Sequence, residues 1–156
     1  ITLYRLVNGD AYLPSISTTE AARLARRGEF PPRDKYRYFI PTSLRRLINK
    51  ALSVNPNDRY QTADEMRHAL EQQKLLVTWD ETNTSNAITW KGESIHKGQY
   101  KLSLYKTGSL KWAIDFEKGY SGRLRRKSSD CHHNLTKDEA HRMARTILQR
   151  VTQSET

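Results

Sequence analysis

Cysteine is almost absent from this sequence, which contains a single one, Cys131, among 156 residues. One thiol cannot form a disulfide within the chain, so no internal cross-link is expected to stabilise the fold. Proteins without disulfides are typical of reducing compartments, and we expect a cytoplasmic location.

Long hydrophobic runs are also missing. No apolar stretch approaches the ~20 residues that a helix needs to cross a bilayer, and the first residues lack the basic-then-apolar pattern of a signal peptide. We therefore expect a soluble protein without a membrane partner. Apolar residues make up only 36% of the chain, which is low for one large core. The sequence predicts two modest domains, residues 1–73 and 74–156.

Acidic residues are outnumbered, with 17 Asp and Glu against 27 Lys and Arg, for a formal net charge of +10. Residues 1–73 have a net charge of 12 − 8 = +4 and residues 74–156 have 15 − 9 = +6. Because both halves share the excess, no strongly basic domain stands apart from a neutral one. A charge of this size makes polyanions candidate partners.

Helical signals dominate the first half. Ser17-Thr18-Thr19-Glu20 has the spacing of a capping box and predicts a helix over about 18–27, which Gly28 would end with a positive φ. Thr62-x-x-Glu65 is a second capping box. Between them, apolar residues recur on one helical face at Leu44, Leu47, Ile48, Ala51 and Leu52.

The hydrophobic period changes to two residues after Lys74, which is typical of strands with one buried face. The alternating residues are Leu75, Val77 and Trp79; Ile88 and Trp90; Tyr100, Leu102 and Leu104; and Leu110, Trp112, Ile114 and Phe116. Thr136-x-x-Glu139 then caps a closing amphipathic helix. We predict an α+β protein, in which an all-helical first part precedes a small antiparallel sheet of four or five strands, covered by one C-terminal helix.

Two stretches of the first half carry a resemblance to a known family. They are Leu3-Tyr4-Arg5-Leu6-Val7-Asn8-Gly9 and Pro41-x-x-Leu44-x-x-Leu47-Ile48-x-Lys50-Ala51-Leu52-x-x-Asn55-Pro56-x-x-Arg59-Tyr60. Together they resemble the C-terminal end of the large lobe of eukaryotic-like (Hanks-type) Ser/Thr protein kinases, over about residues 1–72. We recognise no family for residues 74–156.

The resemblance implies a role for Arg59. In that family the arginine at this place forms a buried ion pair with the glutamate of an Ala-Pro-Glu segment, and a guanidinium suits such a bidentate contact. This sequence has no Ala-Pro-Glu, so the carboxylate partner is missing. The alternative is an ordinary solvated arginine that follows a turn.

The motifs for phosphoryl transfer on the kinase scaffold are absent. The chain has no glycine-rich loop, no Val-Ala-Ile-Lys-like strand, no His-Arg-Asp and no Asp-Phe-Gly. We expect no catalytic residue and no cofactor in this chain, since ATP and Mg²⁺ would belong to the missing catalytic part. Residues 1–7 are expected to be the last turns of a helix that begins upstream, with an apolar face covered by the missing lobe or by a second copy.

Two clusters of reactive side chains are weak candidates for chemistry. Cys131-His132-His133, with His141, is not expected to bind a metal, because adjacent histidines rarely converge on one ion. Asp115 and Glu117 alternate along one strand, which favours a solvent-facing position over a catalytic acid/base pair.

A basic cluster in the second half is the candidate polyanion-binding surface. Its members are Arg123, Arg125, Arg126 and Lys127, together with Lys101, Lys106 and Lys111, and with Tyr105 as a stacking platform. A small sheet backed by one helix is a shape that some DNA-binding domains use. A solvated basic hairpin and an acidic protein partner are the alternatives, and interruption of the surface by Asp115 and Glu117 would count against nucleic acid.

Three hypotheses about function remain at this point. The favoured one is a non-catalytic C-terminal segment of a Ser/Thr protein kinase, whose accessory domain recruits a protein substrate or regulator. The second is a nucleic-acid-binding module that uses the basic sheet face. The third is a small adaptor or inhibitor derived from a kinase lobe.

Overall fold

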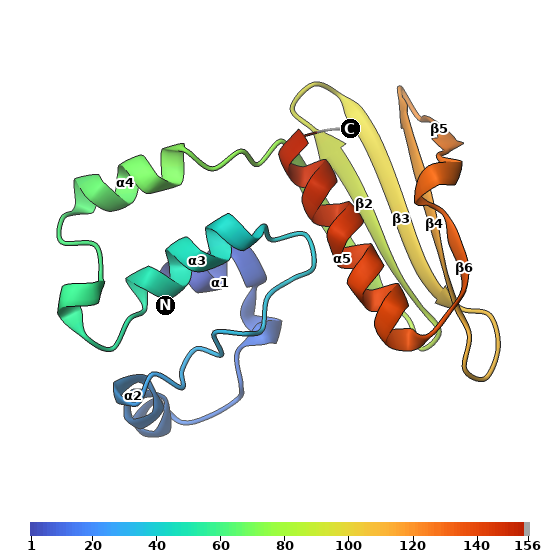
Figure 1. The fold of residues 1–156 in the computed structure, drawn as a ribbon. Helices are drawn as coiled ribbons and strands as arrows, with labels where there is room; N and C mark the ends of the chain where they lie inside the picture. Colours follow the sequence, from blue (N-terminus) through green and yellow to red (C-terminus); the bar gives the residue numbers. More distant parts are fainter. Residues whose placement is uncertain (155–156) are drawn as a thin grey trace. The chain divides into compact units, whose positions relative to one another are not determined.

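The computed structural model describes residues 1–154 and divides the chain into two compact units, Ile1–Gln73 and the residues from Lys74 onward (Figure 1). The chain is α+β: helices form the regular structure of the first unit, and an antiparallel sheet with one long helix forms the second. Within residues 1–154, no helix is both long enough and apolar enough to cross a membrane.

The first unit contains four short α-helices. They are α1 (Thr2–Asn8), α2 (Thr18–Arg26), α3 (Thr42–Ala51) and α4 (Ala63–Glu71), with single 3-10 turns at Asp10–Tyr12 and Pro56–Asp58. The hydroxyl caps of both predicted capping boxes are confirmed, because Ser17 Oγ accepts from the Glu20 amide at 3.2 Å and Thr62 Oγ1 accepts from the Glu65 amide at 3.0 Å. Gly28 has the expected positive φ, at 76°.

The core of the first unit is small and aromatic. Its buried apolar residues are Tyr4, Tyr36, Ile40, Leu44 and Ile48. The rings of Tyr4 and Tyr36 meet edge to face at 5.2 Å, and the Tyr36 hydroxyl donates to Asn49 Oδ1 at 2.8 Å. Burial raises the pKa of Tyr36 to about 12.

The prediction of an all-helical first part is wrong for the segment between α2 and α3. Tyr36 and Ile40 reach the core from this irregular segment, in which Pro31 and Pro32 prevent regular helix. Helix α1 buries Tyr4 against the same core, whereas Leu6 on α1 is 77% exposed.

The second unit is a meander in the order β1-β2-β3-β4-β5, with β6 paired to the other end of β4. The strands are β1 (Val77–Asn83), β2 (Ala87–Ser94), β3 (Gly98–Lys106), β4 (Trp112–Tyr120), β5 (Arg123–Arg126) and β6 (His132–Leu135). The sheet therefore has six strands, not the four or five predicted. The sequence analysis missed β5 and β6, because strands of four mostly polar residues show no alternating apolar pattern.

Helix α5 (Lys137–Ser154) covers one face of this sheet (Figure 1). Trp90, Leu102, Leu104, Ile114 and Phe116 are fully buried beneath it, as the two-residue period predicts. Near the end of α5, Thr152 Oγ1 accepts a hydrogen bond from Trp79 Nε1 at 2.8 Å. The opposite face, which we call the open face, carries the side chains of the alternate register.

The hairpin between β4 and β5 is tight. Ser121 and Gly122 form its two-residue loop, and both have positive φ, at 52° and 79°, as a type I′ turn requires. The Gly122 amide donates to Gln99 Oε1 at 2.7 Å, which ties the loop to β3.

Candidate functional site

Arg59 lies directly after the 3-10 turn Pro56–Asp58 and is bound to the end of α3. Its Nε donates to the Ser53 carbonyl at 2.7 Å and its Nη2 to the Val54 carbonyl at 3.3 Å. The residue is exposed, and it forms no ion pair with any carboxylate in residues 1–154. The guanidinium is thus held in place on one side, without the acidic partner that the kinase resemblance implies.

Small-ligand sites are typically clefts of roughly 300–1,000 Å³. The hollow beside Arg59 measures about 510 Å³. The residues that line it are Ile1, Ala25, Arg26, Phe30, Ala51, Leu52, Ser53, Val54 and Arg59. Two of them are arginines and none is acidic. The arrangement suits a carboxylate that enters beside an apolar side chain.

On the open face of the second unit, the predicted basic residues meet acidic neighbours. Lys101 Nζ lies 2.9 Å from Glu117 Oε2, and Arg126 Nη2 lies 2.7 Å from Asp115 Oδ1. The Tyr105 hydroxyl also donates to Asp115 Oδ2 at 2.7 Å. Asp115 and Glu117 therefore interrupt the positive surface, which counts against nucleic-acid binding by this face.

The electrostatics of Asp115 follow from this network. Burial acts to raise the pKa of the Asp115 carboxyl, but the hydrogen bond from Tyr105 and the charge of Arg126 outweigh it and lower that pKa. The same hydrogen bond, together with partial burial, raises the pKa of Tyr105. The three side chains thus favour an ionised Asp115 and a protonated Tyr105.

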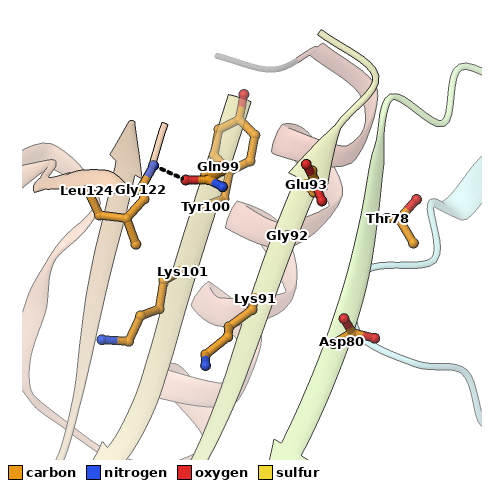
Figure 2. A pocket seen from close by; sticks show the side chains of 10 residues that line it. All are labelled: Thr78, Asp80, Lys91, Gly92, Glu93, Gln99, Tyr100, Lys101, Gly122 and Leu124. Atoms are coloured by element: carbon orange, nitrogen blue, oxygen red, sulfur yellow. Dashed lines mark hydrogen bonds between the residues drawn. The ribbon is translucent and has the colours of Figure 1, made fainter. Parts of the chain in front are cut away.

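A shallow groove of about 410 Å³ crosses the open face over β1, β2 and β3 (Figure 2). Figure 2 shows Lys91 and Lys101 close together on neighbouring strands, with Glu93 further along the strand of Lys91 and Asp80 on the next strand. Two positive and two negative side chains leave this groove with no net charge. It is a polar surface of mixed charge rather than a polyanion site.

The other predicted basic residues lie elsewhere. Lys106 ends β3, and Lys111 in the following loop donates to Asn134 Oδ1 at 3.4 Å. Arg123 and Arg125 pair with Tyr120 and Lys118 and so share the face of the sheet that α5 covers. Lys127 follows β5 and lies 3.4 Å from Asp130. The eight residues proposed from the sequence therefore do not form one surface.

Two further residues were missed by the sequence analysis. Asp130 is only 5% exposed and binds Arg150 of α5 at 2.8 Å, which joins the β5–β6 connection to the helix. Lys118 continues the series Ile114, Phe116, so it occupies a position where the two-residue period calls for an apolar side chain. A charged residue in an otherwise apolar alternating series could have identified Lys118 from the sequence.

The cysteine and histidine cluster forms hydrogen bonds with its surroundings. Cys131 Sγ accepts from the Phe116 amide at 3.4 Å and from Arg126 Nε at 3.3 Å, and Arg126 Nη2 donates to His133 Nε2 at 2.8 Å. In the part of the chain that the structure describes, no group of three or more His, Cys, Asp or Glu side chains is placed to hold a metal ion.

His141 is half-buried against the ring of Trp112, at a centroid distance of 5.5 Å. Burial lowers the pKa of His141, and the charges of Lys137 and Arg145 act in the same direction, against Asp138. A proton NMR titration of the His141 ring should therefore give a midpoint below the usual value of about 6.5. A midpoint at or above that value would contradict the packing.

The sign of the pH effect follows from the lowered pKa. The neutral form of His141 is favoured by folding, so its contribution to stability is present above the unfolded-state pKa and is lost as the pH falls through the folded-state value. We expect His141→Gln to remove this part of the acid sensitivity, while the variant keeps the same fold by circular dichroism.

Comparison with known proteins finds no protein-family model, no curated protein and no solved structure that matches this chain.

Proposed function

We propose that this chain is a non-catalytic segment of a Ser/Thr protein kinase, namely the end of its large lobe followed by an accessory domain that recruits a protein substrate or regulator. The register of Pro41 to Tyr60 supports the proposal. ATP and Mg²⁺ would bind to the catalytic part of the parent protein.

The observation that carries the proposal is the state of Arg59. Its guanidinium is held by two carbonyls at the end of α3 and borders a hollow of about 510 Å³ without an acidic residue. A guanidinium held in this way can bind a carboxylate, and the described residues do not supply one. In a kinase lobe that carboxylate would come from an Ala-Pro-Glu segment.

The test compares Arg59→Gln in two proteins: residues 1–156, and the protein encoded by the complete natural reading frame. In residues 1–156 the substitution removes two exposed hydrogen bonds and should cost about 1 kcal/mol. In the parent kinase it should leave a buried carboxylate unpaired and cost ~3–5 kcal/mol. Urea unfolding followed by circular dichroism measures both.

Arg67→Gln is the matched control, because Arg67 forms only exposed ion pairs with Asp64 and Glu71 within α4. It should cost about 0.5 kcal/mol in either protein. Equal effects of Arg59→Gln in the two proteins, or a natural reading frame without ATP-dependent phosphorylation of a protein substrate, would overturn the proposal.

A further inference from the structure

Two cations face each other across the β4–β5 hairpin without an acidic partner. Lys118 of β4 pairs directly with Arg125 of β5, and on its other side with Tyr100 of β3, so that the three side chains form a row on one face. Neither Lys118 nor Arg125 forms an ion pair with any carboxylate of residues 1–154. Like charges directly opposite each other destabilise a sheet, so stability does not explain the pair.

The row opens into a pocket of about 300 Å³, which we call the β4–β5 pocket. Its walls contain the four cations Lys118, Arg125, Arg126 and Lys127 and the two aromatic residues Tyr100 and Tyr120. Arg126 lies 2.7 Å from Asp115, and Lys127 lies 3.4 Å from Asp130, which also binds Arg150. Lys118 and Arg125 have no such partner, so the pocket has an excess of at least two positive charges and no acidic lining residue.

The backbone of the β4–β5 hairpin, which carries these side chains, is conformationally restricted. Its loop is the two-residue turn Ser121-Gly122, tied to β3 by Gln99. At Gly119 the strands approach so closely that an added Cβ would lie 1.9 Å from the Arg123 carbonyl oxygen. Cations on a rigid support lose less freedom when they bind a ligand, which favours a preformed site.

We propose that the β4–β5 pocket binds a phosphate monoester carried by a protein, a phosphoserine or phosphothreonine side chain. Such a group has a charge of about −1.5 to −2 at neutral pH, which matches the two unpaired cations. Lys and Arg form strong charge-assisted hydrogen bonds with its oxygens. The exposed ring of Tyr120 at the rim can pack against the peptide that carries the phosphate.

The shape of the charge distribution favours a phosphoprotein over nucleic acid. Nucleic-acid binding rests on many backbone phosphates contacted along a groove. Here Lys118 and Arg125 lie within one pocket, and the open face on the other side of the sheet is interrupted by Asp115 and Glu117. The choice of a protein as the carrier rests on the proposed function, since a recruiting domain of a kinase meets phosphorylated substrates. The pocket itself does not depend on that function.

The test uses residues 1–156 and a short fluorescein-labelled phosphoserine peptide without other charges, with fluorescence anisotropy as the readout. We expect it to bind at least about tenfold more tightly than its unphosphorylated form, and free phosphoserine to compete. Lys118→Gln and Arg125→Gln should each weaken binding about tenfold. The amide NMR signals of Gly119 and Arg125 should shift on titration.

Lys106→Gln is the matched control, because it removes the same charge at the end of β3, away from the pocket, and should leave the affinity unchanged. Equal affinities for the two peptides would overturn the inference. Tighter binding of a duplex DNA that Lys106→Gln weakens as much as Arg125→Gln would overturn it in favour of a diffuse nucleic-acid surface. Competition by inorganic phosphate alone, with no preference for the peptide, would show a free-anion site instead and would also overturn it.

The failure of this inference can be told apart from that of the proposed function. The binding experiment needs no catalytic lobe, whereas the comparison of Arg59→Gln in two proteins does not involve the β4–β5 pocket. A positive peptide result with equal Arg59→Gln effects would leave a phosphate-reading domain outside a kinase.

Discussion

Phe116→Ala is expected to lower the free energy of unfolding of the second unit by ~3–5 kcal/mol. Phe116 is fully buried beneath α5, and its ring stacks on Tyr100 at 6.3 Å with an interplanar angle of 15°. The substitution leaves a cavity between the sheet and the helix. Neighbouring core side chains cannot move into this cavity without losing their own contacts, because they are closely packed.

Tryptophan fluorescence during urea unfolding measures this effect for the second unit alone, since all three tryptophans, Trp79, Trp90 and Trp112, belong to it. The control is Leu110→Ala. Leu110 belongs to the same alternating series as Phe116 in the sequence but is 82% exposed in the loop before β4. Its replacement should change stability by no more than about 0.5 kcal/mol. Similar losses for both variants would contradict the assigned register.

Gly119→Ala is expected to separate β5 from β4 at a cost of about 3 kcal/mol, the upper end of the range for overpacking. The new Cβ would lie 1.9 Å from the carbonyl oxygen of Arg123 and 2.8 Å from its carbonyl carbon. Both are backbone atoms, which cannot move aside as a flexible side chain can. Residues 123–126 would then lose their pairing with 117–120.

Amide hydrogen exchange should show this change directly, as faster exchange in β5 while β2 and β3 keep their protection. Gly119→Ala should also abolish phosphopeptide binding, because it displaces Arg125 from Lys118. Gly108→Ala serves as control, since an added Cβ at Gly108 meets no atom within 4 Å. Retention of the β5 protection in Gly119→Ala would contradict the close approach of the two strands.

Local signals in the sequence were sufficient for the helix starts. A capping box joins a hydroxyl to an amide three residues away, so Ser17 with Glu20, and Thr62 with Glu65, needed no long-range information. The buried face of β3 was predicted equally well, because Tyr100, Leu102 and Leu104 alternate without interruption.

The candidate site was harder to predict because it depends on strand register, which the apolar pattern of the sequence marks poorly at the ends of β4 and in the short strands. Leu110 was assigned to a strand for its apolar character, yet the ladder between β3 and β4 begins only where Lys106 pairs with Trp112. The short strand β6 forms by pairing His132 with Ile114, and no periodic pattern marks it. Which cations lack a carboxylate also depends on such pairings.

The α+β class, the capped helices, the alternating apolar face and the excess of positive charge could all be predicted from the sequence. These properties follow from residue types and from spacings of two to four residues. Which charges cancel depends on the folded sheet, which places Lys101 beside Glu117 and Arg126 beside Asp115 and leaves Lys118 and Arg125 facing each other. The reason is physical, since strand register brings together residues separated by loops, and ion pairing depends on distance in space.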